Sequence, residues 1–112
     1  MSRMVTSGIL VVALHLTACC HEAELPNAVR GLYSREVRER NQSLQLIAQC
    51  GGKADKLETS VPRIAALMYD QNVGVASSAA YALRRINTDG ARAALKTAEE
   101  GRNQRRMSSR LP

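Results

Sequence analysis

Apolar residues in the second half of the chain recur at intervals of three and four, which is the spacing of an amphipathic α-helix. One run comprises Leu57, Val61, Ile64, Ala65, Leu67 and Met68, and the next comprises Val75, Ala79, Ala82, Leu83 and Ile86. Between the runs, Asp70 and Asn72 mark a turn and carry side chains able to cap the following helix. Residues 87–90, Asn-Thr-Asp-Gly, end the second run. The pattern predicts two consecutive helices joined by a short turn.

The first half of this region carries the same pattern less regularly. A short helix with Ala28, Val29 and Leu32 is followed by a turn at Ser34, and a second helix has an inward face of Val37, Ser43, Leu46, Ile47 and Cys50. Gly51 and Gly52 come next, and we interpret them as a glycine stop at the helix C-terminus. A fifth helix over residues 91–100 begins a third unit, and the basic residues 101–112 are expected to form a disordered tail.

The two halves are related by a shift of 36 residues. This shift pairs Glu22 with Glu58, Pro26 with Pro62, Tyr33 with Tyr69 and Val37 with Val73, and it pairs the apolar residues Leu25 with Val61, Leu32 with Met68 and Ile47 with Leu83. Self-similarity at a fixed period indicates a repeat architecture. The two prolines occupy equivalent places in the first helix of each pair, where a proline bends or starts a helix.

The composition agrees with helices, because three tyrosines are the only aromatic residues among 112 and a core of small aliphatic side chains suits close helix packing. We therefore expect an all-α fold, a short α-solenoid of antiparallel helix pairs with about two and a half repeats over residues 25–100.

The second repeat resembles a HEAT repeat, in the short bacterial form also found in phycobilisome-lyase-like proteins. The residues that carry the resemblance are Val61-Pro62-Arg63-Ile64-Ala65-Ala66-Leu67, Asp70-Gln71-Asn72, Val75 and Ala79-Ala80-Tyr81-Ala82-Leu83-Arg84-Arg85-Ile86. The resemblance covers residues 22–100, more closely in the second repeat than in the first. The chain departs from the family pattern at Ala76, where Arg is usual, at Arg84, where Gly is frequent, and at Glu39, which stands in the place of Val75.

The N-terminus has the layout of an export signal. Arg3 supplies a positive start, and Val5 to Leu16 is a mostly apolar run that is too short to span a bilayer of about 30 Å. Leu16-Thr17-Ala18-Cys19 resembles the lipobox of bacterial lipoproteins. The resemblance implies cleavage after residue 18, a signal peptide over 1–18, and acyl chains on Cys19 that anchor a leader of residues 19–24 to the membrane. Cys20 follows instead of Asp, which in a two-membrane bacterium implies the periplasmic side of the outer membrane.

Two other readings of this segment remain open. It could be an ordinary signal peptide in which Cys19 occurs by chance, or the apolar first helix of a chain that is not exported. The other two cysteines, Cys20 in the leader and Cys50 in the second helix, could form a bridge in an oxidising compartment. Three cysteines do not make a disulfide framework, so we expect a flexible leader and a buried Cys50.

We find no catalytic constellation in the sequence. His21 is the only histidine after the signal, and neither a Ser-His-Asp set, a glycine-rich phosphate loop nor a metal-binding cysteine spacing is present. The prediction is a chain that is not an enzyme and needs no metal or cofactor. Its function would then reside in a surface, which stacked helix pairs provide along their second helices.

The polar positions of those second helices form a candidate interaction surface. They are Arg38, Gln42, Gln45 and Gln49 in the first repeat, with Ser78, Tyr81 and Arg85 in the second. Under the 36-residue shift Gln45 meets Tyr81 and Gln49 meets Arg85, so the side chains should form one strip. Tyr81 is the expected anchor, because Tyr and Arg are enriched among binding hot spots. Ordinary solvated surface is the alternative.

These patterns predict a lipid-anchored interaction module or scaffold of the cell envelope with an unidentified protein partner. By family resemblance, the alternative is an accessory subunit of an enzyme. The net charge is +6, and much of the excess lies in the tail, so binding of an anionic ligand there is another alternative, beside a merely solvated end. The export signal argues against nucleic acid. Because about three repeats are usually needed for stability, we also expect a partner, a homodimer or sensitivity to truncation of residues 91–100.

Overall fold

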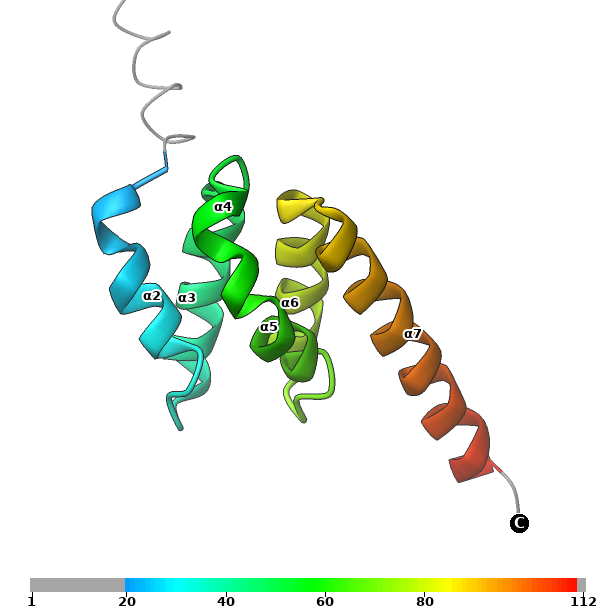
Figure 1. The fold of residues 1–112 in the computed structure, drawn as a ribbon. Coiled ribbons are helices and arrows are strands. Elements are labelled where there is room, and N and C mark those ends of the chain that lie inside the picture. Colours follow the sequence, from blue (N-terminus) through cyan, green and yellow to red (C-terminus); the bar gives the residue numbers. More distant parts are fainter. Residues whose placement is uncertain (1–19, 111–112) are drawn as a thin grey trace, which may run out of the picture.

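All regular structure in the computed structural model, which describes residues 20–110, is helical (Figure 1). The elements are η1 (Glu22–Glu24), α2 (Leu25–Gly31), α3 (Val37–Gln49), α4 (Ala54–Leu57), η2 (Glu58–Ser60), α5 (Val61–Leu67), α6 (Val73–Ile86) and α7 (Asp89–Arg110), where η marks a 3-10 helix. The expected all-α class is confirmed. The expected signal peptide over 1–18 and the expected lipidated Cys19 lie outside the described residues.

The helices pack in consecutive pairs. Helix α2 packs on α3 and α5 packs on α6, while α3 and α6 lie side by side and join the two pairs (Figure 1). The first residues of α2 and α5, Leu25 and Val61, are separated by the 36-residue period, and so are those of α3 and α6, Val37 and Val73. Helix α7 contacts both α5 and α6. The fully buried side chains of the shared core include Leu32, Leu44, Ile47, Leu57, Ile64, Met68, Val75 and Leu83.

The helix ends follow from particular residues. Pro26 and Pro62 lie in the first turn of α2 and α5, each directly after a 3-10 turn, so they start these helices rather than bend them. The Asn72 side chain caps α6 by accepting a hydrogen bond of 3.0 Å from the Val75 amide. Asn87 ends α6 in the left-handed conformation, with a φ of 53°.

The glycine stop expected after α3 is wrong in its mechanism. No glycine in residues 20–110 has a positive φ, so neither Gly51 nor Gly52 takes the left-handed conformation. Gly51 is instead buried against the end of α6, where a Cβ atom would lie 2.5 Å from the carbonyl oxygen of Arg85. The absence of a side chain at this position allows two backbones to approach closely.

The inward face of α3 also differs from the expected one. Ser43, Ile47 and Cys50 are buried as expected, but Val37 is 41% exposed and Leu46 only half-buried. Two residues outside the expected face, Leu44 and Ala48, are buried instead. The reason is that α3 packs against α2 on one side and α6 on the other, which widens and rotates the face that a single apolar stripe predicts.

The expectation of a disordered tail is wrong for residues 101–110, which continue α7 as far as Arg110. The helix is buried through Ala91 and Ala98 and then extends beyond α5 and α6 as an exposed arm (Figure 1). Contact with Tyr69 supports the start of this arm, since Gly101 lies against the Tyr69 hydroxyl and the guanidinium of Arg105 lies 4.4 Å from its ring. Within residues 20–110, none of the helices combines the length and the apolar character that crossing a membrane requires.

Candidate functional site: the groove between α3 and α6

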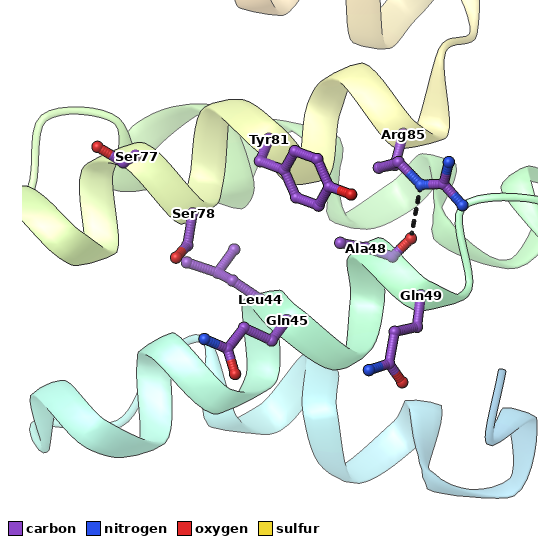
Figure 2. Close-up of a pocket in the computed structure, with 8 residues that line it drawn as sticks. All are labelled: Leu44, Gln45, Ala48, Gln49, Ser77, Ser78, Tyr81 and Arg85. Atoms are coloured by element: carbon purple, nitrogen blue, oxygen red, sulfur yellow. Dashed lines mark hydrogen bonds between the residues drawn. The ribbon is translucent and has the colours of Figure 1, made fainter. Parts of the chain in front are cut away.

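A groove of about 620 Å³ runs between α3 and α6 (Figure 2). It is lined by Leu44, Gln45, Ala48 and Gln49 of α3 and by Ser77, Ser78, Tyr81 and Arg85 of α6. Leu44 and Ala48 are buried and form its apolar floor, whereas most of the polar side chains are exposed. The groove exists because α3 and α6 are neighbours in space although α4, η2 and α5 lie between them in the sequence.

Helical spacing brings the polar side chains to one face. Gln45 and Gln49 are four residues apart on α3, and Tyr81 and Arg85 are four residues apart on α6, so each pair lies on the same side of its helix. The small side chain of Ser78 leaves room at one end of the groove, and its hydroxyl donates a hydrogen bond of 2.5 Å to Asn41 Oδ1. This polar contact joins α3 to α6.

Arg85 is held in place by its neighbours. Its Nε donates a hydrogen bond of 3.3 Å to the carbonyl oxygen of Ala48 across the groove (Figure 2). Its backbone lies against Gly51, as described above. The other guanidinium N–H groups have no protein acceptor in the described part of the chain and remain available to a ligand. Tyr81 is 54% exposed and is the one aromatic side chain that lines the groove.

The structure brings five of the seven residues of the expected strip to this groove: Gln45, Gln49, Ser78, Tyr81 and Arg85. Arg38 and Gln42 are exposed on α3 but do not line it. Sequence reasoning missed Leu44, Ala48 and Ser77. Leu44 and Ala48 could have been predicted, because they are apolar, four residues apart and directly precede the two glutamines on α3.

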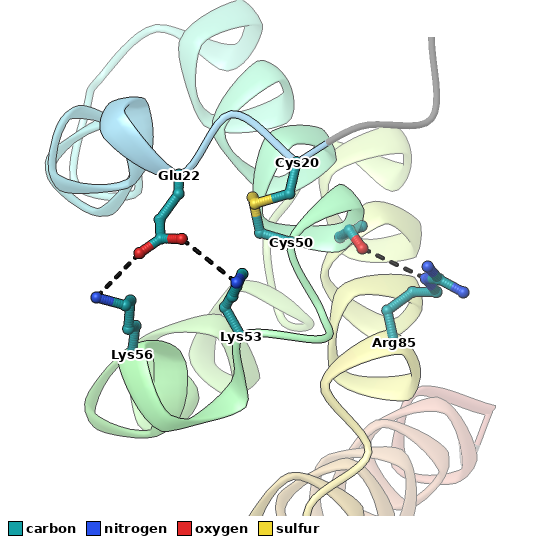
Figure 3. The surroundings of a disulfide bond; sticks show 7 residues. Cys20, Glu22, Cys50, Lys53, Lys56 and Arg85 are labelled. Carbon is teal, nitrogen blue, oxygen red and sulfur yellow. Dashed lines mark hydrogen bonds and ion pairs between the residues drawn. A yellow bond between two sulfur atoms is a disulfide. The ribbon is translucent and has the colours of Figure 1, made fainter. Parts of the chain in front are cut away.

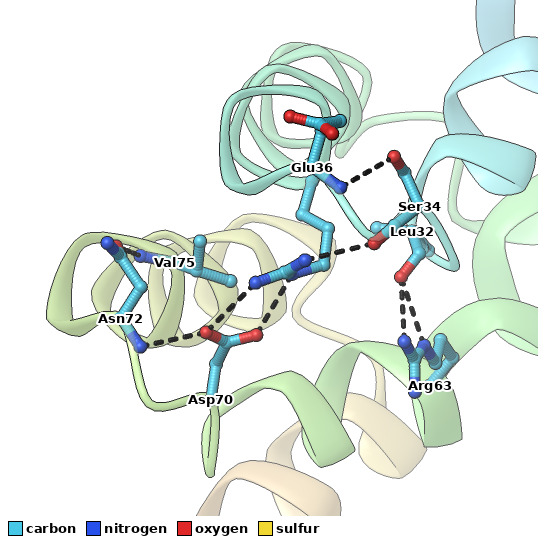
Figure 4. A network of polar contacts seen from close by, with 8 residues as sticks. Leu32, Ser34, Glu36, Arg63, Asp70, Asn72 and Val75 are labelled. Atoms are coloured by element: carbon cyan, nitrogen blue, oxygen red, sulfur yellow. Dashed lines mark hydrogen bonds and ion pairs between the residues drawn. The ribbon is translucent and has the colours of Figure 1, made fainter.

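A second set of polar contacts joins the two helix pairs at the turns that follow α2 and α5 (Figure 4). Arg40 of α3 donates to both Asp70 oxygens, at 3.0 and 3.3 Å, and to the Ser34 carbonyl oxygen at 2.9 Å. Asp70 also accepts a hydrogen bond of 2.9 Å from the Asn72 amide. Arg63 of α5 donates to the Leu32 carbonyl oxygen at 3.1 and 2.9 Å. Each arginine joins its own helix pair to the turn between the two helices of the other pair. Their N–H donors are largely used by these bonds, so we regard this set of contacts as structural.

Residues 20–24 of the leader are ordered, because Cys20 and Cys50 form a disulfide with a Cα–Cα distance of 4.7 Å (Figure 3). The expectation of a flexible leader is therefore wrong for these residues, and of the two states left open for Cys20 and Cys50 the structure has the bridged one. The burial of Cys50, which is 1% exposed, was expected. The bridge depends on folding: α2 and α3 are antiparallel neighbours, so the chain entering α2 meets the end of α3.

Charged residues reinforce the same corner. Glu22 forms ion pairs with Lys56 at 3.0 Å and with Lys53 at 3.5 Å (Figure 3). The hydrogen bond and positive charge of Lys56, helped by Lys53, lower the pKa of the Glu22 carboxyl below its ordinary value of 4.5. Reciprocally, the hydrogen bond and charge of Glu22 raise the pKa of Lys56 above 10.5. These exposed pairs fasten η1 to α4 and the loop before it.

The groove is equipped for binding through hydrogen bonds. Its lining offers two amide side chains, three hydroxyls and one guanidinium, but no carboxylate, imidazole or thiol that could act as a general base or nucleophile. In residues 20–110 no group of three His, Cys, Asp or Glu side chains is arranged to hold a metal ion. The amide, hydroxyl and guanidinium groups of the groove can form hydrogen bonds with backbone groups and carboxylates of another chain.

Comparison with known proteins gives no relative: no model of a protein family matches the chain, and neither a curated protein nor a solved structure is significantly similar to it.

Proposed function

We propose that this chain is an envelope lipoprotein whose α3–α6 groove binds a segment of another protein without catalysing a reaction. In this proposal the helix pairs are HEAT-like repeats of a short α-solenoid, and acyl chains on Cys19 hold the domain at the membrane. The single observation that carries the binding function is the groove itself, in which Tyr81 and Arg85 stand above an apolar floor.

The composition of the groove supports a protein segment as ligand. Amide side chains such as Gln45 and Gln49 can donate to and accept from a peptide backbone. A half-exposed tyrosine supplies apolar contact area, and Tyr and Arg are among the residues enriched at binding hot spots. The open guanidinium of Arg85 favours a carboxylate on the partner.

The disulfide supports export. Disulfides form and persist in oxidising compartments such as the periplasm and are rare in the cytosol. The bridge between Cys20 and Cys50 follows the expected lipidated residue directly, so it would fix the domain close to its anchor. A lipidated Cys19 and a bridged Cys20 are compatible, because each uses a different thiol.

The groove is tested by photo-crosslinking in a bacterium that produces the full chain. A photoreactive residue is placed at Gln49, which lines the groove, or at Gln42, which is exposed on the same helix outside it. We expect a discrete crosslinked product from Gln49 only, weakened by Tyr81→Ala. A product of twice the chain's mass would identify the partner as a second copy. Equal products from both positions, or none from either, would contradict the proposal.

Lipid attachment is tested separately by incorporation of labelled palmitate. We expect Cys19→Ala to abolish the label and Cys20→Ser to retain it, because only the first residue of the mature chain accepts lipid in the lipobox family. Label that is absent from the wild-type chain, or present in Cys19→Ala, would refute the anchor.

A further inference from the structure

A second cleft lies between the arm of α7 and the turn that joins α5 to α6. Its volume is about 320 Å³, and its lining includes Tyr69, Asp70, Arg102, Arg105, Arg106 and Ser109. It is separate from the α3–α6 groove and shares no residue with it. Three arginines thus face one small cleft that the proposed function does not use.

The basic charge of this cleft is not neutralised by its surroundings. Residues 101–110 contain four arginines and no acidic residue. Within residues 20–110 neither Arg102, Arg105 nor Arg106 forms an ion pair. The one carboxylate of the lining, Asp70, is already engaged by both contacts from Arg40 and by a backbone amide. The positive charges of the three arginines in the cleft are therefore not balanced by an ion pair in the described part of the chain.

Comparison of the two repeats shows that Arg105 lacks an acceptor. At the end of the first repeat, Tyr33 is covered by Arg63 of α5, whose guanidinium lies 4.5 Å from the ring and donates to the Leu32 carbonyl oxygen. At the end of the second repeat, the corresponding residue Tyr69 is covered by Arg105 of α7, whose guanidinium lies 4.4 Å from the ring. It has no hydrogen-bond acceptor in the described part of the chain. Stacking holds the guanidinium plane still and leaves its N–H groups open.

The position of the arm is also held. Gly101 lies so close to Tyr69 that a Cβ atom there would be 2.0 Å from the tyrosine hydroxyl and 3.1 Å from the ring carbon that carries it. Tyr69 is therefore packed between the glycine and the arginine one helical turn later. Arg105 is therefore preorganised at the cleft, which lowers the entropy cost of binding, and Arg102 and Arg106 lie beside it on the same helix.

We propose that this cleft binds a phosphate group. Guanidinium groups match the tetrahedral oxyanion through paired N–H···O hydrogen bonds, and several positive charges favour a phosphate over a single carboxylate. The hydroxyl of Ser109 adds a neutral donor at the rim. A volume of about 320 Å³ admits a phosphate with a small carrier, such as a phosphorylated metabolite or a lipid headgroup.

The test is calorimetric titration of the full chain in a neutral detergent. Inorganic phosphate is titrated in one arm, and phosphatidylglycerol carried in the same micelles is titrated in the other, at constant ionic strength. We expect saturable binding in at least one arm, and the arm that saturates at the lower concentration identifies the source of the phosphate. Absence of saturable binding in both arms would overturn the proposal, and so would binding equalled by chloride.

Paired variants separate a site from general charge. The double variant Arg105→Gln and Arg106→Gln removes two positive charges from the cleft, and we expect at least a tenfold loss of affinity. The double variant Arg35→Gln and Lys96→Gln removes two exposed charges elsewhere, and we expect a change of less than twofold. If both double variants lost affinity equally, binding would depend on net charge alone, and the site would be refuted. Circular dichroism confirms that helix content is retained, so that a loss of binding is not a loss of the arm.

Discussion

Replacement of Gly51 by alanine is the sharpest test of the packing that places Arg85 in the groove. A Cβ atom at residue 51 would lie 2.5 Å from the Arg85 carbonyl oxygen, 2.7 Å from its carbonyl carbon and 3.0 Å from its Cβ atom. The first two are backbone atoms of the last turn of α6. They cannot rotate away, so the loop and the helix end must separate.

The expected magnitude follows from this overlap. Overpacking by a methyl group in a closely packed region costs about 1–3 kcal/mol of unfolding free energy. Alanine also restricts the unfolded chain, which offsets the loss by about 0.4–1 kcal/mol. The neighbouring Gly52 provides a matched control, because a Cβ atom there meets nothing within 4 Å and its φ is not positive. The entropy contribution is common to both substitutions, so their stabilities should differ by about 1–3 kcal/mol.

Urea unfolding of the two variants, with the disulfide intact, measures this difference directly. We expect Gly51→Ala to be the less stable, and thermal melting of the same variants should show a Tm gap of roughly 4–8 °C for each kcal/mol in a domain of this size. Because the clash is at Arg85, Gly51→Ala should also weaken binding in the groove, whereas Gly52→Ala should not. Equal stability of the two variants, or a more stable Gly51→Ala, would refute the close approach of the two backbones.

Three further predictions concern the ends of the domain. Cys20→Ser opens a loop that spans 30 positions, so urea unfolding should show a loss of roughly 3–4 kcal/mol; insensitivity of the wild-type chain to reductant would contradict the bridge. The lowered pKa of Glu22 means that its pairing with Lys56 stabilises the fold above pH 4.5 and is lost as the pH falls through the folded-state pKa. The stability difference between wild type and Glu22→Gln should accordingly vanish in acid, and an NMR titration of Glu22 that gives an ordinary or raised pKa would exclude this pairing. Truncation after residue 89 removes the buried contacts of α7 and should lower the Tm, whereas an unchanged melting curve would show that the two helix pairs are stable alone.

The main helix pairs and their 36-residue spacing can be predicted from the order of residues alone. Apolar spacing and turn residues are local properties, so the positions of α5 and α6, the cap at Asn72 and the 36-residue correspondence could all be inferred without coordinates. Five of the seven strip residues also reach one groove, because polar positions on the same face of a helix remain together once that helix is placed. The position of Arg38 and Gln42 outside the groove could not be inferred, because the pattern does not say where along α3 the neighbouring helix lies.

Features that depend on contact between residues far apart in the sequence emerge only in the folded chain. Composition favoured a disordered end, but Tyr69 contacts Gly101 and Arg105, and α7 continues to Arg110. The partner of Cys20 and the reason for Gly51 were likewise set by where α3 ends relative to α2 and α6. Periodicity records which side of a helix is apolar, whereas the choice of neighbour depends on packing between surfaces that the order of residues does not place side by side.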